Sequence, residues 1–86
     1  MEPRILKEFL RTAGPAYQQI LKEAVRQEDA NLANPNYLGW EWHEVRAYPA
    51  RLMKLVVAGI ITINYKSNSS SCYLLVDRAA TKAAVE

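Results

Sequence analysis

Four basic residues lie in a stretch of the chain that contains no acidic residue. Arg46, Arg51, Lys54 and Lys66 give residues 46–76 a net charge of +4, whereas residues 1–45 hold five Lys/Arg against seven Asp/Glu. Cations gathered in one segment suit a phosphate backbone, because each can neutralise a phosphate. We therefore predict that this segment contacts nucleic acid. The alternative is a solvated basic face of the kind that many domains carry by chance.

No grouping of residues indicates catalysis or a bound metal. His43 has no second His at metal-ligand spacing, and the serines from Ser67 to Ser71 lack the flanking glycines that expose a nucleophile. Cys72 is the only cysteine, so it cannot form an internal disulfide. We predict a protein that is not an enzyme and that needs no cofactor or metal ion.

The middle of the basic segment has the pattern of a short helix. Pro49 suits a first helical turn, because its missing N–H would have no intrahelical partner there. Leu52, Leu55 and Ala58 recur every three residues and predict one buried stripe. Gly59 then ends the helix, because glycine accepts the positive φ of a helix cap. The predicted helix covers about residues 49–58.

Two strands should follow this helix. Residues 60–66 and 72–76 are apolar or alternating, and the serine-rich residues 67–71 between them form a turn. The sequence Leu52-x-x-Leu55-x-x-Ala58-Gly59-Ile60-Ile61 resembles the recognition helix and following strand of winged helix-turn-helix DNA-binding domains. The resemblance covers about residues 15–77. It implies an α+β fold with a three-helix core and a two-stranded β-wing, and double-stranded DNA as the partner.

The resemblance also implies a role for each exposed residue. In such domains the recognition helix enters the major groove, and the wing touches the backbone or the minor groove. With Leu52 and Leu55 facing inward, Arg51 is the candidate for a base contact, because its planar fork can pair with guanine O6 and N7. The residues expected to contact the DNA backbone are Arg46, Tyr48, Lys54, Lys66, Ser67, Asn68, Ser69 and Ser70. Alternatively, Tyr48 packs against the preceding helix and the serine-rich tip is a flexible, solvated turn.

Apolar spacing predicts three helices before the basic segment. They are an N-terminal helix over residues 3–11, a core helix that starts at Pro15, and a second core helix over about residues 40–47. In the last of these, Trp42 and Val45 should face inward. The clearest stripe belongs to the helix from Pro15 and consists of Tyr17, Ile20, Leu21, Ala24 and Val25.

The chain should form one domain. Residues 78–85 are Ala-rich and predict a short C-terminal helix that needs docking to hold. Residues 1–86 then make a single winged-helix domain, with a core over about 15–77 and an N-terminal helical extension over 1–12. A chain of 86 residues is near the size at which one core gives marginal stability.

Several apolar residues do not fit a plain DNA-binding module. Met53, Val56 and Val57 lie on the predicted recognition helix, and Trp40 is a candidate exposed anchor for a partner or for an unstacked base. The valines could be covered by the N-terminal helix, by a second copy in a homodimer, or by another protein in a larger assembly. The alternative function is therefore a winged-helix module for protein–protein interaction.

Location and biological role can be stated only as classes. No apolar run approaches the roughly 20 residues of a membrane helix, and the N-terminus lacks the layout of a signal peptide. We expect an intracellular protein, cytoplasmic or nucleoid-associated, that has no membrane partner. It would act as a small transcription regulator or as an accessory domain of a replication or repair protein.

Overall fold

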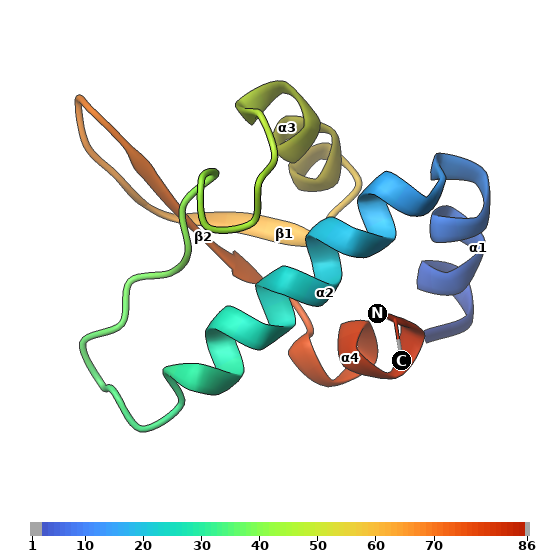
Figure 1. The fold of residues 1–86 in the computed structure, drawn as a ribbon, viewed down its shortest axis with the longest axis horizontal. Coiled ribbons are helices and arrows are strands. Elements are labelled where there is room, and N and C mark those ends of the chain that lie inside the picture. The colour runs from blue at the N-terminus through green and yellow to red at the C-terminus, as the bar shows by residue number, and fades with distance from the viewer. Residues whose placement is uncertain (1–2, 86) are drawn as a thin grey trace.

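The computed structural model describes residues 3–85, which form an α+β domain (Figure 1). Its elements in chain order are α1 (Pro3–Ala13), α2 (Pro15–Ala30), α3 (Pro49–Val57), β1 (Ile61–Lys66), β2 (Ser71–Leu75) and α4 (Arg78–Val85). The two strands pair antiparallel. The predicted α+β class is confirmed. In the described range no helix is both long and apolar enough to cross a membrane.

Gly14 alone separates α1 from α2. Its φ of 101° is open to glycine at little cost, and its N–H donates to the Leu10 carbonyl at 3.0 Å, which closes the last turn of α1. Pro15 then starts α2 with a φ already suited to a helix. The predicted break is confirmed, although α1 continues two residues past Arg11, to Ala13.

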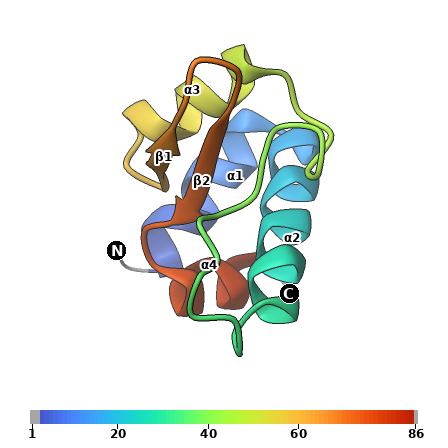
Figure 2. The ribbon, with the colours of Figure 1, turned by 90° about the vertical axis from the view of Figure 1, so that its left-hand side faces the viewer.

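Helix α2 supplies the central face of the core. Figure 2 shows α2 on one side of the molecule and the β1–β2 hairpin on the other, with α4 below the hairpin and beside the lower end of α2. The predicted stripe of α2 is buried at Ile20, Leu21, Ala24 and Val25, and Tyr17 is partly buried. The flanking helices contribute further buried residues to the same core: Leu6 and Leu10 of α1 and Ala84 and Val85 of α4. Ala80 of α4 is buried as well. Residues outside 15–77 are therefore part of the core and not an extension of it.

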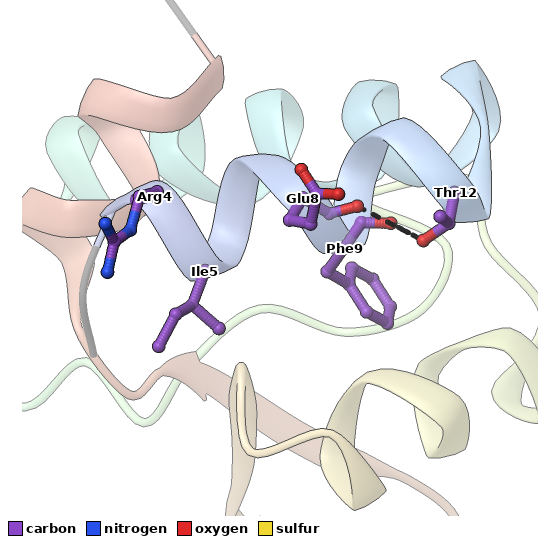
Figure 3. Close-up of a pocket in the computed structure, with 5 residues that line it drawn as sticks. All are labelled: Arg4, Ile5, Glu8, Phe9 and Thr12. Carbon is purple, nitrogen blue, oxygen red and sulfur yellow. Dashed lines mark hydrogen bonds between the residues drawn. The ribbon is translucent and has the colours of Figure 1, made fainter.

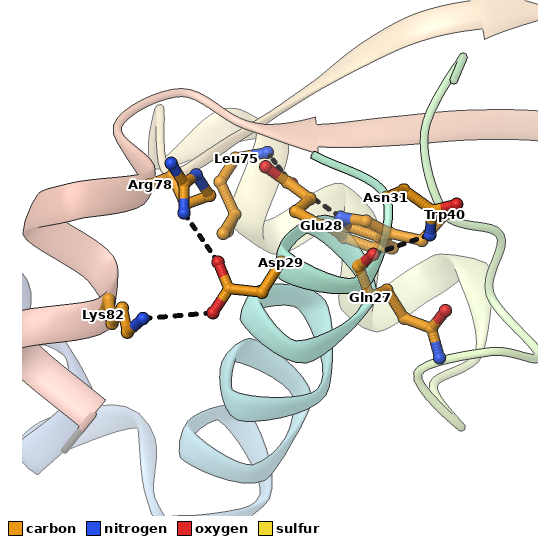
Figure 4. Close-up of polar contacts among 8 residues, drawn as sticks. All are labelled: Gln27, Glu28, Asp29, Asn31, Trp40, Leu75, Arg78 and Lys82. Carbon is orange, nitrogen blue, oxygen red and sulfur yellow. Dashed lines mark hydrogen bonds and ion pairs between the residues drawn. The ribbon is translucent and has the colours of Figure 1, made fainter. Parts of the chain in front are cut away.

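A buried carboxylate joins α2 to the segments it packs against (Figure 4). Glu28 accepts a hydrogen bond from the indole Nε1 of Trp40 at 2.9 Å and another from the backbone N–H of Leu75 at 2.7 Å. Burying a carboxylate is costly unless it is hydrogen-bonded, and these two donors supply that compensation. Glu28 thus ties α2 to β2 and to the chain around residue 40.

The short helix α4 is held by polar contacts as well as by apolar burial (Figure 4). Asp29 of α2 pairs with Arg78 at 2.6 Å and with Lys82 at 3.1 Å, and both cations lower the pKa of that carboxyl, Lys82 most. Asp77 caps the helix by accepting from the Ala80 N–H at 3.0 Å, which lowers the pKa of Asp77. These contacts provide the docking that a helix of this length requires.

The helix predicted over residues 40–47 does not form. Trp40 exchanges two backbone hydrogen bonds with Tyr73, at 3.0 and 2.9 Å, so that residue 40 pairs with β2 like a strand. Its ring stacks on the Tyr73 ring with centroids 5.4 Å apart, and it is fully buried. A Cβ at Gly39 would clash with the Tyr73 backbone, so this close pairing needs a glycine before Trp40. Trp40 is core, and its predicted role as an exposed anchor is wrong.

Residues 42–46 form turns instead of a helix. The Ala47 N–H donates to the Trp42 carbonyl at 3.0 Å, and Arg46 adopts a left-handed φ of 56°, which breaks helical geometry. Val45 is buried as predicted. Trp42 is not: 42% of its surface is exposed. Trp40 is therefore buried and Trp42 exposed, the reverse of what was predicted. The reason is that the backbone of Trp40 is hydrogen-bonded to Tyr73, and the chain turns outward after it.

Helix α3 and the hairpin follow the predicted order with small differences. Leu52 and Leu55 are buried and α3 packs against β1, but Ala58 is exposed and lies just past the helix end. Gly59, with φ 79°, makes the turn into β1, as expected. The strand pairing is irregular between Ile63 and Tyr65.

The N-terminal helix does not cover the apolar side chains of α3. α1 packs mainly against α4 and α2, and Val57 remains 81% exposed. Met53 of α3 and Ile5 of α1 are also exposed, while Val56 is partly buried against the core. Intramolecular cover, the first expectation for the valines, is therefore wrong for Val57. Leu6 and Leu10 of α1 are buried in the core, where the helix packs against α4 and α2.

Candidate nucleic-acid interface

The burial of α3 fixes which of its side chains face outward. With Leu52 and Leu55 in the core, Arg51 and Lys54 are exposed, as the sequence predicted. Arg46, in the turn before the helix, is exposed as well. The first turn of α3 carries no acidic residue that would offset the positive end of the helix dipole there.

Arg46 and Arg51 share a surface hollow of about 250 Å³, called here the helix hollow. Its other walls come from α2 and the preceding turn, at Ala16, Gln19, Ile20, Glu23 and Val45. Glu23 belongs to the acidic half of the sequence, and it lies beside both arginines in space. The basic and acidic parts of the sequence are therefore not fully separated in the folded molecule, because Glu23 shares this hollow with two arginines.

Lys54 is positioned differently from Arg51. Its ammonium lies 5.4 Å from the centroid of the Tyr17 ring of α2, within the range of a cation–π contact. This contact holds the lysine toward α2. A lysine held there is a point charge that can meet phosphate but has no fork to read a base pair.

The hairpin tip presents one cation and several polar groups. Lys66, the last residue of β1, is exposed, as are Asn68 and Ser69. The Ser67 hydroxyl is less available, because it accepts from the Ser70 N–H at 3.1 Å and helps to close the turn. Ser67 therefore has a structural role in the tip, whereas Asn68 and Ser69 are open to solvent.

An exposed aromatic pair lies between the hairpin tip and α3. The rings of Trp42 and Tyr48 stack with centroids 6.2 Å apart and planes inclined by 19°. Tyr48 is 75% exposed. The preceding helix of the alternative interpretation does not form, and Tyr48 packs instead on Trp42 of that segment. The sequence did not reveal this pair, because the two rings meet only through the left-handed turn at Arg46.

Trp42 also lines two further hollows, one on the hairpin side and one on the Tyr48 side. The hairpin hollow, of about 270 Å³, is lined by Trp42, Pro49, Tyr73, Lys66 and the tip residues 67–71. The tyrosine hollow, of about 240 Å³, is lined by Trp42, Arg46, Ala47 and Tyr48. Because Trp42 lines both of these and Arg46 lines both the tyrosine and the helix hollows, the surface is continuous from Lys66 to Arg51.

Besides Glu23, a second carboxylate lies close to this surface. Glu41 contacts the His43 ring at 2.9 Å, and the hydroxyl of Ser70 and His43 together lower the pKa of the Glu41 carboxyl.

Burial also raises the pKa of two other titratable groups. Burial raises the pKa of the Cys72 thiol and raises that of Tyr37 to about 12. In the part of the chain that the structure describes, no three His, Cys, Asp or Glu side chains are grouped so that they could hold a metal ion.

Neither a protein-family model nor a curated protein sequence matches this chain. The arrangement of its own residues is therefore the ground for a proposal about function.

Proposed function

We propose that this domain is a winged-helix module that binds double-stranded DNA through α3 and the β1–β2 hairpin. It would serve as a small transcription regulator or as an accessory domain of a replication or repair protein. The element order supports this fold: α2, a paired residue at Trp40, α3 and then the hairpin. The turns at residues 42–46 take the place of the second core helix and are this chain's departure from the expected pattern.

The observation that carries the proposal is the continuous surface from Lys66 to Arg51. Its cations come from the hairpin, the turn and the helix, which are the parts expected to meet successive phosphates along a groove. The α3 helix is within the dimensions that a major groove admits. Arg51 then faces base edges, whereas Arg46, Lys54 and Lys66 are suited to phosphates.

The test is a titration of fluorescently labelled duplex at several salt concentrations. With about four neutralised phosphates, log affinity should fall against log salt with a slope of about −3 to −4, since each contributes about 0.9. Lys7, an exposed cation of α1, provides the control, and Lys7→Ala should leave the slope unchanged. Absence of binding at low salt, or binding that ignores salt, would exclude the proposal.

A second candidate function is protein contact through the apolar residues of α1 and α3. Val57 and Met53 are exposed on α3, and Ile5 and Phe9 project from α1 into a shallow pocket that also includes Arg4, Glu8 and Thr12 (Figure 3). Large exposed apolar side chains of this kind are typical of interaction surfaces. The same titration decides between the two functions, because a domain that binds no DNA leaves this apolar surface as the interface.

A further inference from the structure

We propose that Trp42 and Tyr48 form a stacking platform for an unpaired base, so that the domain prefers DNA with a single-stranded end to a blunt duplex. This inference rests on the proposed function and specifies which DNA the interface takes. It starts from the exposure of the pair: a 75% exposed Tyr48 stacked on a 42% exposed Trp42 leaves aromatic surface in water. Bases inside a duplex are already stacked on their neighbours, so only an unpaired base can use that surface.

The surroundings of the pair favour a nucleotide over an apolar peptide. Cations flank it on both sides, with Lys66 in the hairpin hollow and Arg46 in the tyrosine hollow. The hairpin hollow also presents the hydroxyl and amide groups of residues 67–71, which can hydrogen-bond a base edge or a phosphate. Aromatic surface between two phosphate-binding cations is the composition of single-strand binding sites. Of the exposed apolar residues of α3, in contrast, Val57 lies at the other end of the helix and Met53 at its middle.

The platform is also held in place before any ligand arrives. The Trp42 carbonyl accepts from the Ala47 N–H, which closes the turn, and the neighbouring Trp40 is anchored in the core by Glu28 and Tyr73. On the other side, the Tyr48 carbonyl accepts from the N–H groups of Arg51 and Leu52, which fixes the backbone of Tyr48 at the start of α3. A fixed platform loses little conformational freedom on binding. Its position would place the unpaired base where the strand leaves the groove occupied by α3.

The experiment compares three DNAs that share one duplex: blunt, with a tail of three thymidines, and with a tail of three abasic nucleotides. The tails are tested at the 3′ and at the 5′ end. The abasic tail carries the same phosphates without bases, so it separates charge from stacking. The thymidine tail at one of the two ends should bind about 5- to 100-fold tighter than its abasic counterpart, since stacking contributes about 1–3 kcal/mol per base.

Variants assign the effect to the platform. Trp42→Leu should abolish the preference for bases in the tail, whereas Trp42→Phe should keep most of it. Tyr65→Leu is the matched control, because Tyr65 is an exposed aromatic residue of β1 that lines neither hollow. Emission from the buried Trp40 reports that the Trp42 variants remain folded.

Two results would overturn the inference: equal affinity for base-containing and abasic tails at both ends, or a preference that survives Trp42→Leu. Both leave salt-dependent binding to the blunt duplex intact, so they are distinct from a failure of the proposed function. If the protein does not bind the blunt duplex at all, the proposed function is wrong. The platform then cannot be part of a duplex interface.

Discussion

Arg51 and Lys54 are separated by one helical turn and have different surroundings. Arg51 opens into the helix hollow beside Arg46 and Glu23, where its guanidinium is free to make a planar, two-pronged contact. Lys54 is drawn over the Tyr17 ring. The two cations should therefore contribute to DNA binding in different ways, as their residue types also predicted.

We expect Arg51→Ala to weaken binding to a preferred duplex by about 1–3 kcal/mol and to affect random duplex less, because a bidentate base contact carries discrimination. Lys54→Ala should weaken binding to all sequences alike and reduce the salt slope by about 1. Anisotropy titrations on a selected and on a random duplex measure both effects. If Arg51→Ala costs the same on both duplexes, Arg51 contacts only phosphate.

At the scale of the elements, Glu28 connects segments that are far apart in the sequence. It bonds Trp40 and Leu75, and so joins α2, the residue paired with β2, and β2 itself. The sequence held a signal for this role: Glu28 lies four residues after Ala24 and three after Val25, on the buried stripe of α2. An acidic residue at a core position indicates a buried partner.

Glu28→Ala should lower the free energy of unfolding by about 2–5 kcal/mol, because it leaves the Trp40 indole and the Leu75 N–H as buried donors without acceptors. Glu28→Gln retains an oxygen and should cost less. The control is Glu23→Ala on the same helix, where a surface pair with Arg26 at 3.5 Å contributes at most about 1 kcal/mol. Urea unfolding monitored by circular dichroism measures all three. Equal midpoints for Glu28→Ala and Glu23→Ala would contradict this role.

The same elements show which parts of the structure the sequence could predict. The break at Gly14, the start of α3 at Pro49 and the turn at Gly59 depend on local backbone preferences, and the sequence predicted each of them. The helix over residues 40–47 was wrong because the partner of Trp40 is Tyr73, far away in the sequence, and no local pattern reports that pairing. The aromatic platform was missed for the same reason, since it exists only where this segment turns outward.

For the whole molecule, the helices outside α3 and the hairpin complete the core, and ion pairs link two of them. Asp29 is shared between Arg78 and Lys82, and it links α2 to the last helix of the chain. These groups lie partly in solvent, so each pair by itself adds little stability. Their arrangement nevertheless makes the docking of α4 sensitive to pH.

Acid should therefore weaken the fold through Asp29. Its pKa in the folded state is lowered from 3.8 by the hydrogen bond and charge of Lys82 and by Arg78. A carboxyl with a lowered folded-state pKa stabilises the protein above its unfolded-state pKa, and that contribution is lost as the pH falls through the folded-state value. Wild-type stability should thus decline as the pH drops below about 4.

Asp29→Asn removes this linkage, so the variant should be less stable than wild type at pH 7 and lose less stability between pH 7 and pH 2.5. The double variant Arg78→Gln, Lys82→Gln keeps the carboxyl but removes its partners, and it should flatten the pH dependence in the same direction. Urea midpoints at the two pH values measure both. An unchanged pH dependence in Asp29→Asn would show that acid acts elsewhere, with Asp77 as the next group to test, because its pKa is lowered by the Ala80 N–H at the start of the same helix.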